Sequence, residues 1–364
     1  MKNIMVTGGC GFIGSNFIRY LLTAPDFKKD MRIINVDKLT YAGNRESLYG
    51  ISEAFTGQYV FVQADICDRQ AMEKVFDEFE IDTVCHFAAE SHVDRSIVEP
   101  DAFVQTNIMG TFNLLDLFRA RKDRMFLFHH VSTDEVFGSL GKFGHFTETT
   151  PYNPSSPYSA SKASSDHLVR AYTHTFAIPT TLSNCSNNYG PYQYPEKLIP
   201  LMILNAMEGK KLPVYGRGLN IRDWLYVKDH CRGIWEIMNR GKRGETYNIG
   251  GDCEKRNIDV VFMICDILDG MEPLKNGRPR RELVEFVDDK KLRPGHDFRY
   301  AIDFSKIQVE LGWAPEESFK TGLEKTIRWY LDNPSWVNLV QKKCGDWLCR
   351  HYKGAEPPRW NNVN

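Results

Sequence analysis

The sequence predicts an α/β protein with a doubly wound parallel sheet and a smaller, interleaved C-terminal domain. Short apolar runs typical of buried strands occur at residues 3–7, 32–37, 59–65, 83–89 and 126–132. Stretches long enough for helices separate them, and this alternation favours parallel strands with helical crossovers. Beyond Pro191 the alternation becomes irregular, which predicts a second domain.

Length and composition limit the possible function classes. The chain has 364 residues, with 46 Lys and Arg against 47 Asp and Glu. The length suggests about two domains at ~150 residues each, and the balanced charge argues against nucleic acid as a main partner. No apolar run of about 18 residues predicts a membrane span. The start of the chain shows no signal-peptide pattern. Nine scattered cysteines predict reduced thiols in the cytoplasm and no metal site.

The first element combines a strand, a glycine turn and a helix. The apolar run at 3–7 leads into Gly8-x-x-Gly11-x-x-Gly14, and helical apolar spacing follows at 15–23. Glycine lets the backbone approach a pyrophosphate, and the helix N-terminus offers free N–H groups to that anion. The order predicts a Rossmann-type dinucleotide site. A tight turn without a ligand is the alternative.

Polar or small residues follow the other expected strands. Asp37 ends the second strand, 23 positions after Gly14, where a carboxylate would bind ribose hydroxyls. Because it would repel a 2′-phosphate, NAD is favoured over NADP. Asp65 and Ile66 end the third strand, and Ala88 and Ala89 end the fourth. In such sheets ligands lie beyond the carboxyl ends of the strands.

The fifth strand runs into candidate catalytic residues. Thr133, Asp134 and Glu135 follow it, and Tyr158 lies four residues before Lys162. Helical spacing places the last two on one face, and a nearby ammonium would ease deprotonation of the phenol, making Tyr158 a candidate base. As alternatives, the Tyr–Lys pair is a solvated helix face and Thr-Asp-Glu is a helix cap.

Together, the glycine turn, the fifth-strand Thr and Tyr158-x-x-x-Lys162 resemble the extended short-chain dehydrogenase/reductase family. More narrowly, the chain is similar to the family of dTDP-glucose 4,6-dehydratases. The similar segments reach to about residue 312 and include residues 36–44, 88–96, 132–136, 156–162, 187–192, 222–227 and 293–297. Cys10, Phe137 and the stretch 288–292 depart from the family pattern. The last departure puts the placement of Arg293 in doubt.

The resemblance implies two domains and a tail. The NAD-binding domain would comprise residues 1–186 and 221–252, with 225–227, the helical run 231–238 and 245–251 returning to the large sheet. The sugar-nucleotide domain would comprise 187–220 and 253–335, and the tail 336–364 has no assigned role.

The resemblance also implies the site residues. NAD would be bound by Gly8, Gly11, Phe12, Ile13, Gly14, Asp37, Lys38, Leu39, Thr40, Asp65, Ile66, Ala88, Ala89, Thr106, Tyr158, Lys162 and Asn188. The nucleotide sugar, dTDP-glucose, would be bound by Ser91, His92, Thr133, Asn187, Glu196, Lys197, Leu198, Pro213, Tyr215, Arg222, Asn257, Arg293 and His296.

The expected reaction is a redox-assisted dehydration. Tyr158, made acidic by Lys162, takes the 4-hydroxyl proton while hydride leaves C4 for NAD, and Thr133 hydrogen-bonds that hydroxyl. Glu135 then removes the C5 proton, and Asp134, predicted to be protonated, gives a proton to the departing 6-hydroxyl. The alternatives are a sugar-nucleotide epimerase or decarboxylase, and an NAD-binding regulator without catalysis.

Family members usually pair as homodimers through a four-helix bundle. In this chain the helices would be those at 104–121 and 159–176. Ile108, Phe112, Leu115 and Phe118 have the apolar spacing this needs, which core packing would also give.

Overall fold

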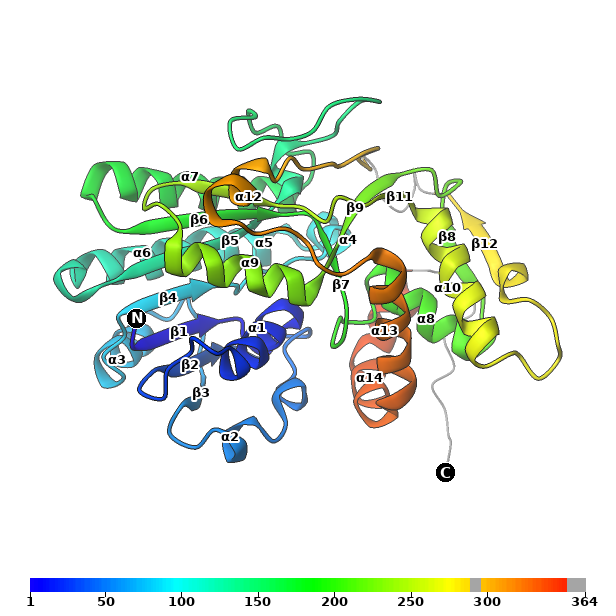
Figure 1. Ribbon diagram of the computed structural model, residues 1–364, viewed down its shortest axis with the longest axis horizontal. Helices are drawn as coiled ribbons and strands as arrows, with labels where there is room; N and C mark the ends of the chain where they lie inside the picture. Colours follow the sequence, from blue (N-terminus) through cyan, green and yellow to red (C-terminus); the bar gives the residue numbers. More distant parts are fainter. Residues whose placement is uncertain (289–295, 352–364) are drawn as a thin grey trace.

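The computed structural model describes residues 1–288 and 296–351, with side chains described as far as residue 344. Its centre is a seven-stranded sheet in the order β10-β6-β5-β4-β1-β2-β3 (Figure 1). All of its strand pairs are parallel. The strands are β1 (Asn3–Thr7), β2 (Arg32–Asp37), β3 (Tyr59–Gln63), β4 (Thr83–His86), β5 (Leu127–Thr133), β6 (Thr180–Cys185) and β10 (Thr246–Ile249).

Helices cover both faces of this sheet, because alternate strand residues bury apolar side chains on opposite sides. Ile4 and Val6 of β1 join one apolar core, whereas Met5 joins another. The first core is closed by α1 (Phe12–Thr23), α9 (Val227–Arg240) and α12 (Ser305–Leu311). The second is closed by α3 (Arg69–Glu78), α6 (Thr111–Ala120) and α7 (Pro157–Phe176). The doubly wound α/β fold is therefore confirmed.

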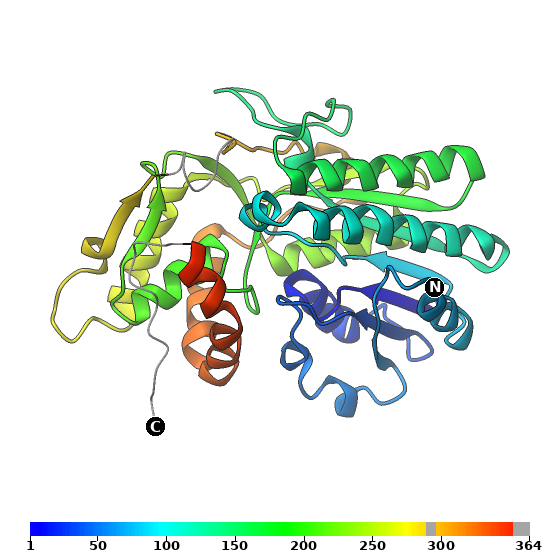
Figure 2. The ribbon, with the colours of Figure 1, turned by 180° about the vertical axis from the view of Figure 1, so that it is seen from behind.

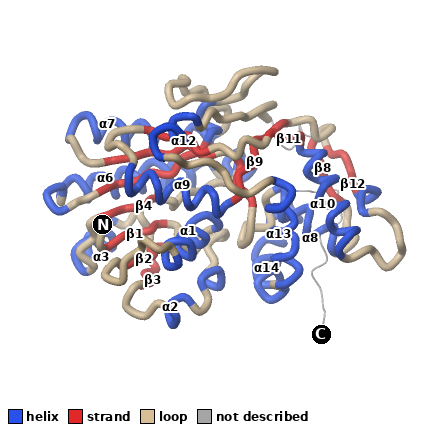
Figure 3. The backbone as a smooth tube through the Cα atoms, viewed as in Figure 1, coloured by secondary structure: helices blue, strands red, loops and turns tan. Residues whose placement is uncertain are grey.

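A smaller lobe lies beside the sheet, at the right of Figure 1 and at the left of the reverse view in Figure 2. Its core is formed by α8 (Leu198–Met207), α10 (Asn257–Met271), α13 (Phe319–Asp332) and α14 (Pro334–His351). One small sheet pairs β7 (Asn187–Tyr189), β9 (Ile221–Tyr226) and β11 (Glu254–Arg256), and a second pairs β8 (Leu212–Tyr215) with β12 (Val284–Val287). Figure 3 shows these short strands apart from the large sheet.

Short helical segments complete the connections. Those on the sheet side are η1 (Arg45–Leu48), α2 (Ile51–Ala54), α4 (Val93–Val98), α5 (Pro100–Phe103), η2 (Val104–Gly110), η3 (Lys122–Arg124) and η4 (Asp134–Phe137). The smaller lobe contains η5 (Arg280–Leu283). The segment η2 is a π-helix that continues directly into α6.

Several expectations about elements need correction. Residues 225–227 do not return to the large sheet, because β9 pairs with β7 and β11. The helix α9 that follows does pack on α1, and β10 joins the large sheet as expected. The third and fourth strands end at Gln63 and His86, earlier than predicted, and α1 begins at Phe12 rather than residue 15. The proposed domain boundaries stay a prediction.

The described start of the tail, in α14, packs against the lobe. Trp336, Val337, Val340 and Cys344 of α14 are buried in its core. The indole N–H of Trp336 reaches Ser47 at 3.1 Å, on the sheet side of the molecule. This helix therefore ties the smaller lobe to the loop after β2. Within the described ranges, none of the helices is long and apolar enough to cross a membrane.

Candidate functional site

The glycine turn between β1 and α1 is closely packed against β4. A Cβ on Gly8 would lie 2.7 Å from the backbone of Ala88, and one on Gly14 would lie 2.4 Å from the Gly8 carbonyl oxygen. Gly8 also has a φ of +69°, which favours glycine. Within the described part of the chain, no side chain caps the start of α1. Its first N–H groups can therefore face an anion, as a dinucleotide pyrophosphate requires.

Asp37 lies at the end of β2 with 8% of its surface exposed. Its carboxylate accepts hydrogen bonds from the backbone N–H groups of Leu39 at 2.7 Å and Cys10 at 2.9 Å. Burial raises the pKa of Asp37, and these two hydrogen bonds partly offset that rise. A Cβ on Gly43 would lie 2.8 Å from this carboxylate, so the loop leaves it room.

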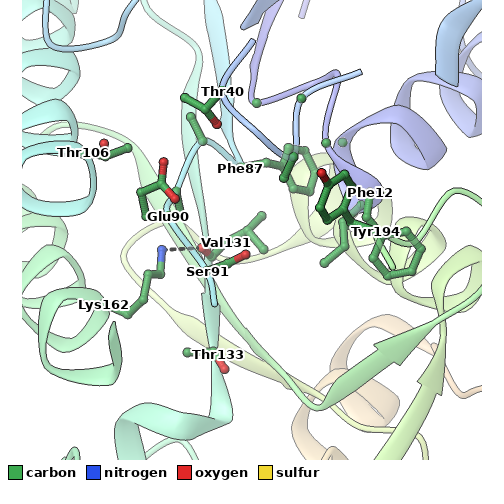
Figure 4. A pocket seen from close by; sticks show the side chains of 18 of the residues that line it. Phe12, Thr40, Phe87, Glu90, Ser91, Thr106, Val131, Thr133, Lys162 and Tyr194 are labelled. Atoms are coloured by element: carbon green, nitrogen blue, oxygen red, sulfur yellow. Dashed lines mark hydrogen bonds between the residues drawn. The ribbon is translucent and has the colours of Figure 1, made fainter. Parts of the chain in front are cut away.

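A cavity of about 290 Å³ runs along the carboxyl ends of β1 to β5. Figure 4 shows it from close by, with Thr40, Thr106, Phe12 and Tyr194 around it. Most residues predicted to hold NAD line it: Gly8, Gly11, Phe12, Ile13, Gly14, Asp37, Lys38, Thr40, Asp65, Ile66, Ala88, Ala89, Thr106, Tyr158, Lys162 and Asn188. Leu39 is not among the lining residues, and its backbone instead fixes Asp37.

Lys38 and Asp65 form an ion pair of 2.7 Å beside this cavity. Asp65 also accepts from the backbone N–H of Cys67. Burial would raise the pKa of Asp65, but Lys38 and this hydrogen bond outweigh it and lower the value overall. The pair joins the ends of β2 and β3, where an adenosine group would lie.

Thr133, Asp134 and Glu135 lie where β5 passes into η4. The Thr133 hydroxyl accepts from the Glu135 N–H at 3.3 Å, so the capping interpretation is also correct. Asp134 is 1% exposed, and among the described residues its Oδ2 has no hydrogen-bond partner. Burial raises the pKa of Asp134 well above its usual value, and the nearby carboxylates of Glu135 and Asp223 raise it further. The structure thus favours a protonated Asp134.

Tyr158 and Lys162 project from the first turns of α7 toward β5. Figure 4 shows Lys162 directed at the carbonyl oxygen of Val131, to which Nζ donates at 2.9 Å. The predicted lowering of the Tyr158 pKa is wrong for the protein alone. Burial raises that pKa well above its usual value, Glu135 raises it further, and a hydrogen bond with Thr133 offsets this in part. Lys162 does not offset this rise of the Tyr158 pKa, because its ammonium is directed to the Val131 carbonyl of β5 and to His130.

A second cavity, of about 160 Å³, opens toward the smaller lobe. Glu135, Asn187, Asn188, Gln193, Glu196 and Lys197 line both cavities. Predicted substrate residues in the second one are His92, Asn187, Glu196, Lys197, Leu198, Pro213, Tyr215, Arg222, Asn257 and His296. Ser91 and Thr133 line the first cavity. Arg293 lies outside the described residues.

Two of these side chains are held in ways the sequence did not predict. Arg222 donates to the carbonyl oxygens of Ile221 and Asp297 at 2.8 and 3.0 Å, and its guanidinium stacks on Tyr300. It therefore anchors residues 297–300 beside the cavity. The Tyr215 hydroxyl donates to Asp94 at 3.1 Å, and its ring lies edge-on to His296. Both residues still line the space where a nucleotide would lie.

Sequence reasoning missed several lining residues. Glu90, Cys185, Ser186, Gln193 and Tyr194 line the first cavity, and Asp94, Trp224 and Tyr300 line the second. Glu90 directly follows Ala89, so its place after the fourth strand was a usable signal. Tyr194 and Tyr300 lie in irregular segments, where no periodicity predicts which way a side chain points. Cys10, which departs from the family pattern, is buried and binds Asp37 through its backbone.

Comparisons with known proteins agree with this geometry. The family model for GDP-mannose 4,6 dehydratase matches residues 5–326. The dTDP-glucose 4,6-dehydratase 1 of Escherichia coli (strain K12) is 53% identical, over 97% of this chain and 99% of the relative. The crystal structure of dTDP-glucose 4,6-dehydratase from Bacillus anthracis str. Ames in complex with NAD has a TM-score of 0.82. That protein is 46% identical, with 93% of this chain and 100% of that chain covered. The crystal structure of DesIV (dTDP-glucose 4,6-dehydratase) from Streptomyces venezuelae, with NAD bound, has a TM-score of 0.84. That protein is 43% identical, with 92% of this chain and 98% of that chain covered.

Proposed function

Because the chain belongs to the family of nucleotide-sugar 4,6-dehydratases, we propose that it is a dTDP-glucose 4,6-dehydratase. It converts dTDP-glucose to dTDP-4-dehydro-6-deoxyglucose and water with NAD as its cofactor. One observation carries the proposal most directly. Asp134, Glu135 and Tyr158 all line the cavity that holds the predicted NAD residues, and Glu135 also lines the second cavity. Two adjacent acids are needed for elimination of water, whereas an epimerase or decarboxylase has no use for both.

The residues present fit NAD. The uncapped start of α1 and the closely packed Gly8 and Gly14 suit a pyrophosphate, and Asp37 suits ribose hydroxyls. When bound, NAD supplies the oxidant that accepts hydride from C4 of the sugar and later returns it to C6. Because the cofactor ends as it began, we expect purified protein to carry NAD.

The chain's own groups divide the proton transfers among them. Tyr158 takes the proton of the 4-hydroxyl as a phenolate, a form that the positive charges of Lys162 and of the nicotinamide of bound NAD would favour, and Thr133 holds that hydroxyl. The resulting 4-keto group acidifies C5, and Glu135 removes the C5 proton; C5 regains a proton when hydride adds to C6. Asp134, buried and protonated, gives its proton to the 6-hydroxyl so that water leaves. Environment thus assigns opposite roles to two neighbouring carboxyl groups.

The second cavity suits a nucleoside diphosphate. The side-chain oxygens of Asn187 and Asn257 are buried there without hydrogen-bond partners among the described residues. Lys197 and Arg222 bring positive charge, and Tyr215 brings an aromatic ring. Diphosphates are commonly bound by such cations, and aromatic faces suit a base. Arg293 is retained as a proposed contact from the family resemblance.

Incubation with dTDP-glucose tests the assignment. We expect release of water and the alkaline ultraviolet absorbance of a 4-keto-6-deoxy sugar, without added NAD. Formation of dTDP-galactose would instead establish an epimerase. Binding of NAD with no turnover of any nucleotide sugar would support the regulator. An empty, NADP-preferring protein would contradict the role of Asp37.

We also propose a cytoplasmic homodimer that pairs through η2–α6 and α7. Figures 1 and 2 show α6 and α7 side by side, and both pack on one face of the sheet. Large apolar side chains are exposed on these elements, with Val104 at 50%, Met109 at 46%, Phe112 at 39% and Phe176 at 37%. Leu115 and Phe118 are instead buried in the core. Sedimentation of Phe112→Glu, expected to be monomeric, tests this pairing.

A further inference from the structure

A line of buried polar groups lies behind Lys162, on the side away from the cavity. Lys162 Nζ is 3.3 Å from Nε2 of His130, and that same Nε2 is 3.2 Å from Oδ1 of Asp166. The side chains of His130 and Asp166 are 0% exposed, and Lys162 is 4% exposed. Because Asp166 follows Lys162 by four residues, both lie on one face of α7.

We propose that Asp166 is the buried counter-ion of Lys162, and that His130, which lies between the two, positions the ammonium for its work beside Tyr158. The proposal rests on the proposed function and adds two positioning residues to it. Neither His130 nor Asp166 lines either of the two cavities described above. They would act on the sugar through Lys162, without touching it.

Charge and hydrogen-bonding capacity support this arrangement. An ammonium can only donate and a carboxylate can only accept, and His130 Nε2 lies between them. The ring is therefore placed to accept from the ammonium through an unprotonated Nε2, while among the described residues Asp166 Oδ1 makes no hydrogen bond and faces this pair as an anion. A buried cation is costly unless it is paired. Asp166 is the carboxylate that opposes the loss of charge at Lys162, whose pKa burial lowers.

Asp166 is itself held as an anion. Its Oδ2 accepts hydrogen bonds from Ser132 at 2.8 Å and from Tyr152 at 2.9 Å. Arg170 in turn donates to the Tyr152 hydroxyl at 2.8 Å. Burial alone would raise the pKa of Asp166, but His130, Lys162 and Ser132 lower it overall. Burial and Lys162 lower the pKa of His130 to about 4, so the ring is neutral near pH 7.

The other groups around Lys162 do not replace this carboxylate. From β4, His86 is buried with its ring 5.2 Å from that of His130, and burial lowers its pKa well below the usual value. From β6, burial raises the pKa of the Cys185 thiol, which leaves it neutral. From β5, Val131 offers a carbonyl oxygen. Asp166 is thus the buried anion on the side of Lys162 away from the cavity.

The test is the pH dependence of the sugar-oxidation step, followed as transient NADH absorbance in single turnovers of the holoenzyme with dTDP-glucose. Asp166→Asn keeps the size and one acceptor but removes the charge. The ammonium should then lose its proton at lower pH, so the basic limb of this step moves down by about 1–3 pH units. His130→Asn should move it in the same direction by less.

The neighbouring histidine provides a matched control. His129 is also fully buried on β5, but its ring bonds Thr181 and Ser183 on the other face of the strand. His129→Asn should lower stability by a similar amount and leave the basic limb in place. A pH profile that moves equally in His129→Asn and His130→Asn would show a merely structural effect.

If Asp166→Asn does not fold, His130→Asn carries the test, with its smaller downward shift of the basic limb. An unmoved basic limb in the variant that folds overturns the proposal. Wild-type protein that never oxidises dTDP-glucose would instead overturn the proposed function. The two failures are therefore distinguishable.

Discussion

The two cavities are built in different ways. The first lies mainly along the strand ends of one parallel sheet, with residues that follow β1, β2, β3, β4 and β5, and residues between 185 and 197 complete it. The second is assembled from β7, α8, β8, β9 and residues 296–300, which lie in separate parts of the chain. The strand pattern of the sequence therefore predicts most residues that line the first cavity, whereas the residues that line the second depend on tertiary packing. Variants can test whether the two also separate in function.

Glu135 lines both cavities, so its loss should give the largest effect. Glu135→Gln removes the base that takes the C5 proton, and kcat should fall about 10²–10⁴-fold. Oxidation at C4 should persist, so NADH should accumulate in single turnovers while exchange of the C5 hydrogen with solvent is lost.

Glu148→Gln is the control for this change. Glu148 is a partly buried acid that accepts a hydrogen bond from the Asn248 backbone, away from both cavities. Exchange at C5 should stay normal in this variant. Undiminished C5 exchange in Glu135→Gln would assign the base to another residue.

Asp134→Asn should lower kcat by about 10²-fold, toward the lower end of the range for proton transfer. The pKa of Asp134 is raised, so its acid form persists below that pKa and is lost as pH rises through it. In wild-type protein the elimination step should therefore slow at high pH, and this dependence should vanish in the variant. Rapid-mixing measurements of water loss across pH provide the check.

Asp37→Asn should weaken the binding of NAD in the first cavity and leave the second cavity unchanged. Losing a charged acceptor costs about 1.5–3 kcal/mol, which corresponds to roughly 10–100-fold in NAD affinity. The NAD that copurifies with the protein should decrease, while kcat recovers when NAD is added in excess. A variant that retains NAD as wild-type protein does would remove Asp37 from the binding site.

Arg222→Lys should weaken the binding of the sugar nucleotide in the second cavity and leave NAD binding unchanged. Lysine cannot reproduce the planar donors that bind the carbonyl oxygens of Ile221 and Asp297. We expect KM for dTDP-glucose to rise about 10-fold, one hydrogen bond to a charged group, with NAD content unchanged. A fall in NAD content would show that the two cavities do not separate at this residue.

Trp336→Phe should have the smallest effect. It removes the hydrogen bond to Ser47 while keeping an aromatic ring in the lobe core. Stability should fall by about 0.5–1.5 kcal/mol, seen as a lower Tm with kcat unchanged. A large loss of activity would assign α14 a direct role in the site.

The sequence predicted the sheet, the glycine turn and the strand-end acids because each depends on neighbours in the chain. Asp37 and Asp65 lie where alternation places them. The direction of Lys162 could not be predicted, because it depends on the Val131 carbonyl and on His130 across the helix–strand interface. The pairing of β9 also depends on partners far away in sequence, so the sequence pattern wrongly predicts that residues 225–227 join the large sheet.

Asn187, Asn188, Gln193, Glu196 and Lys197 line both cavities. Residues shared in this way would let each ligand change the affinity of the protein for the other. Any such coupling free energy is the same in both directions, since linkage is reciprocal. A slow dissociation of NAD during turnover would then be a property of the ternary complex.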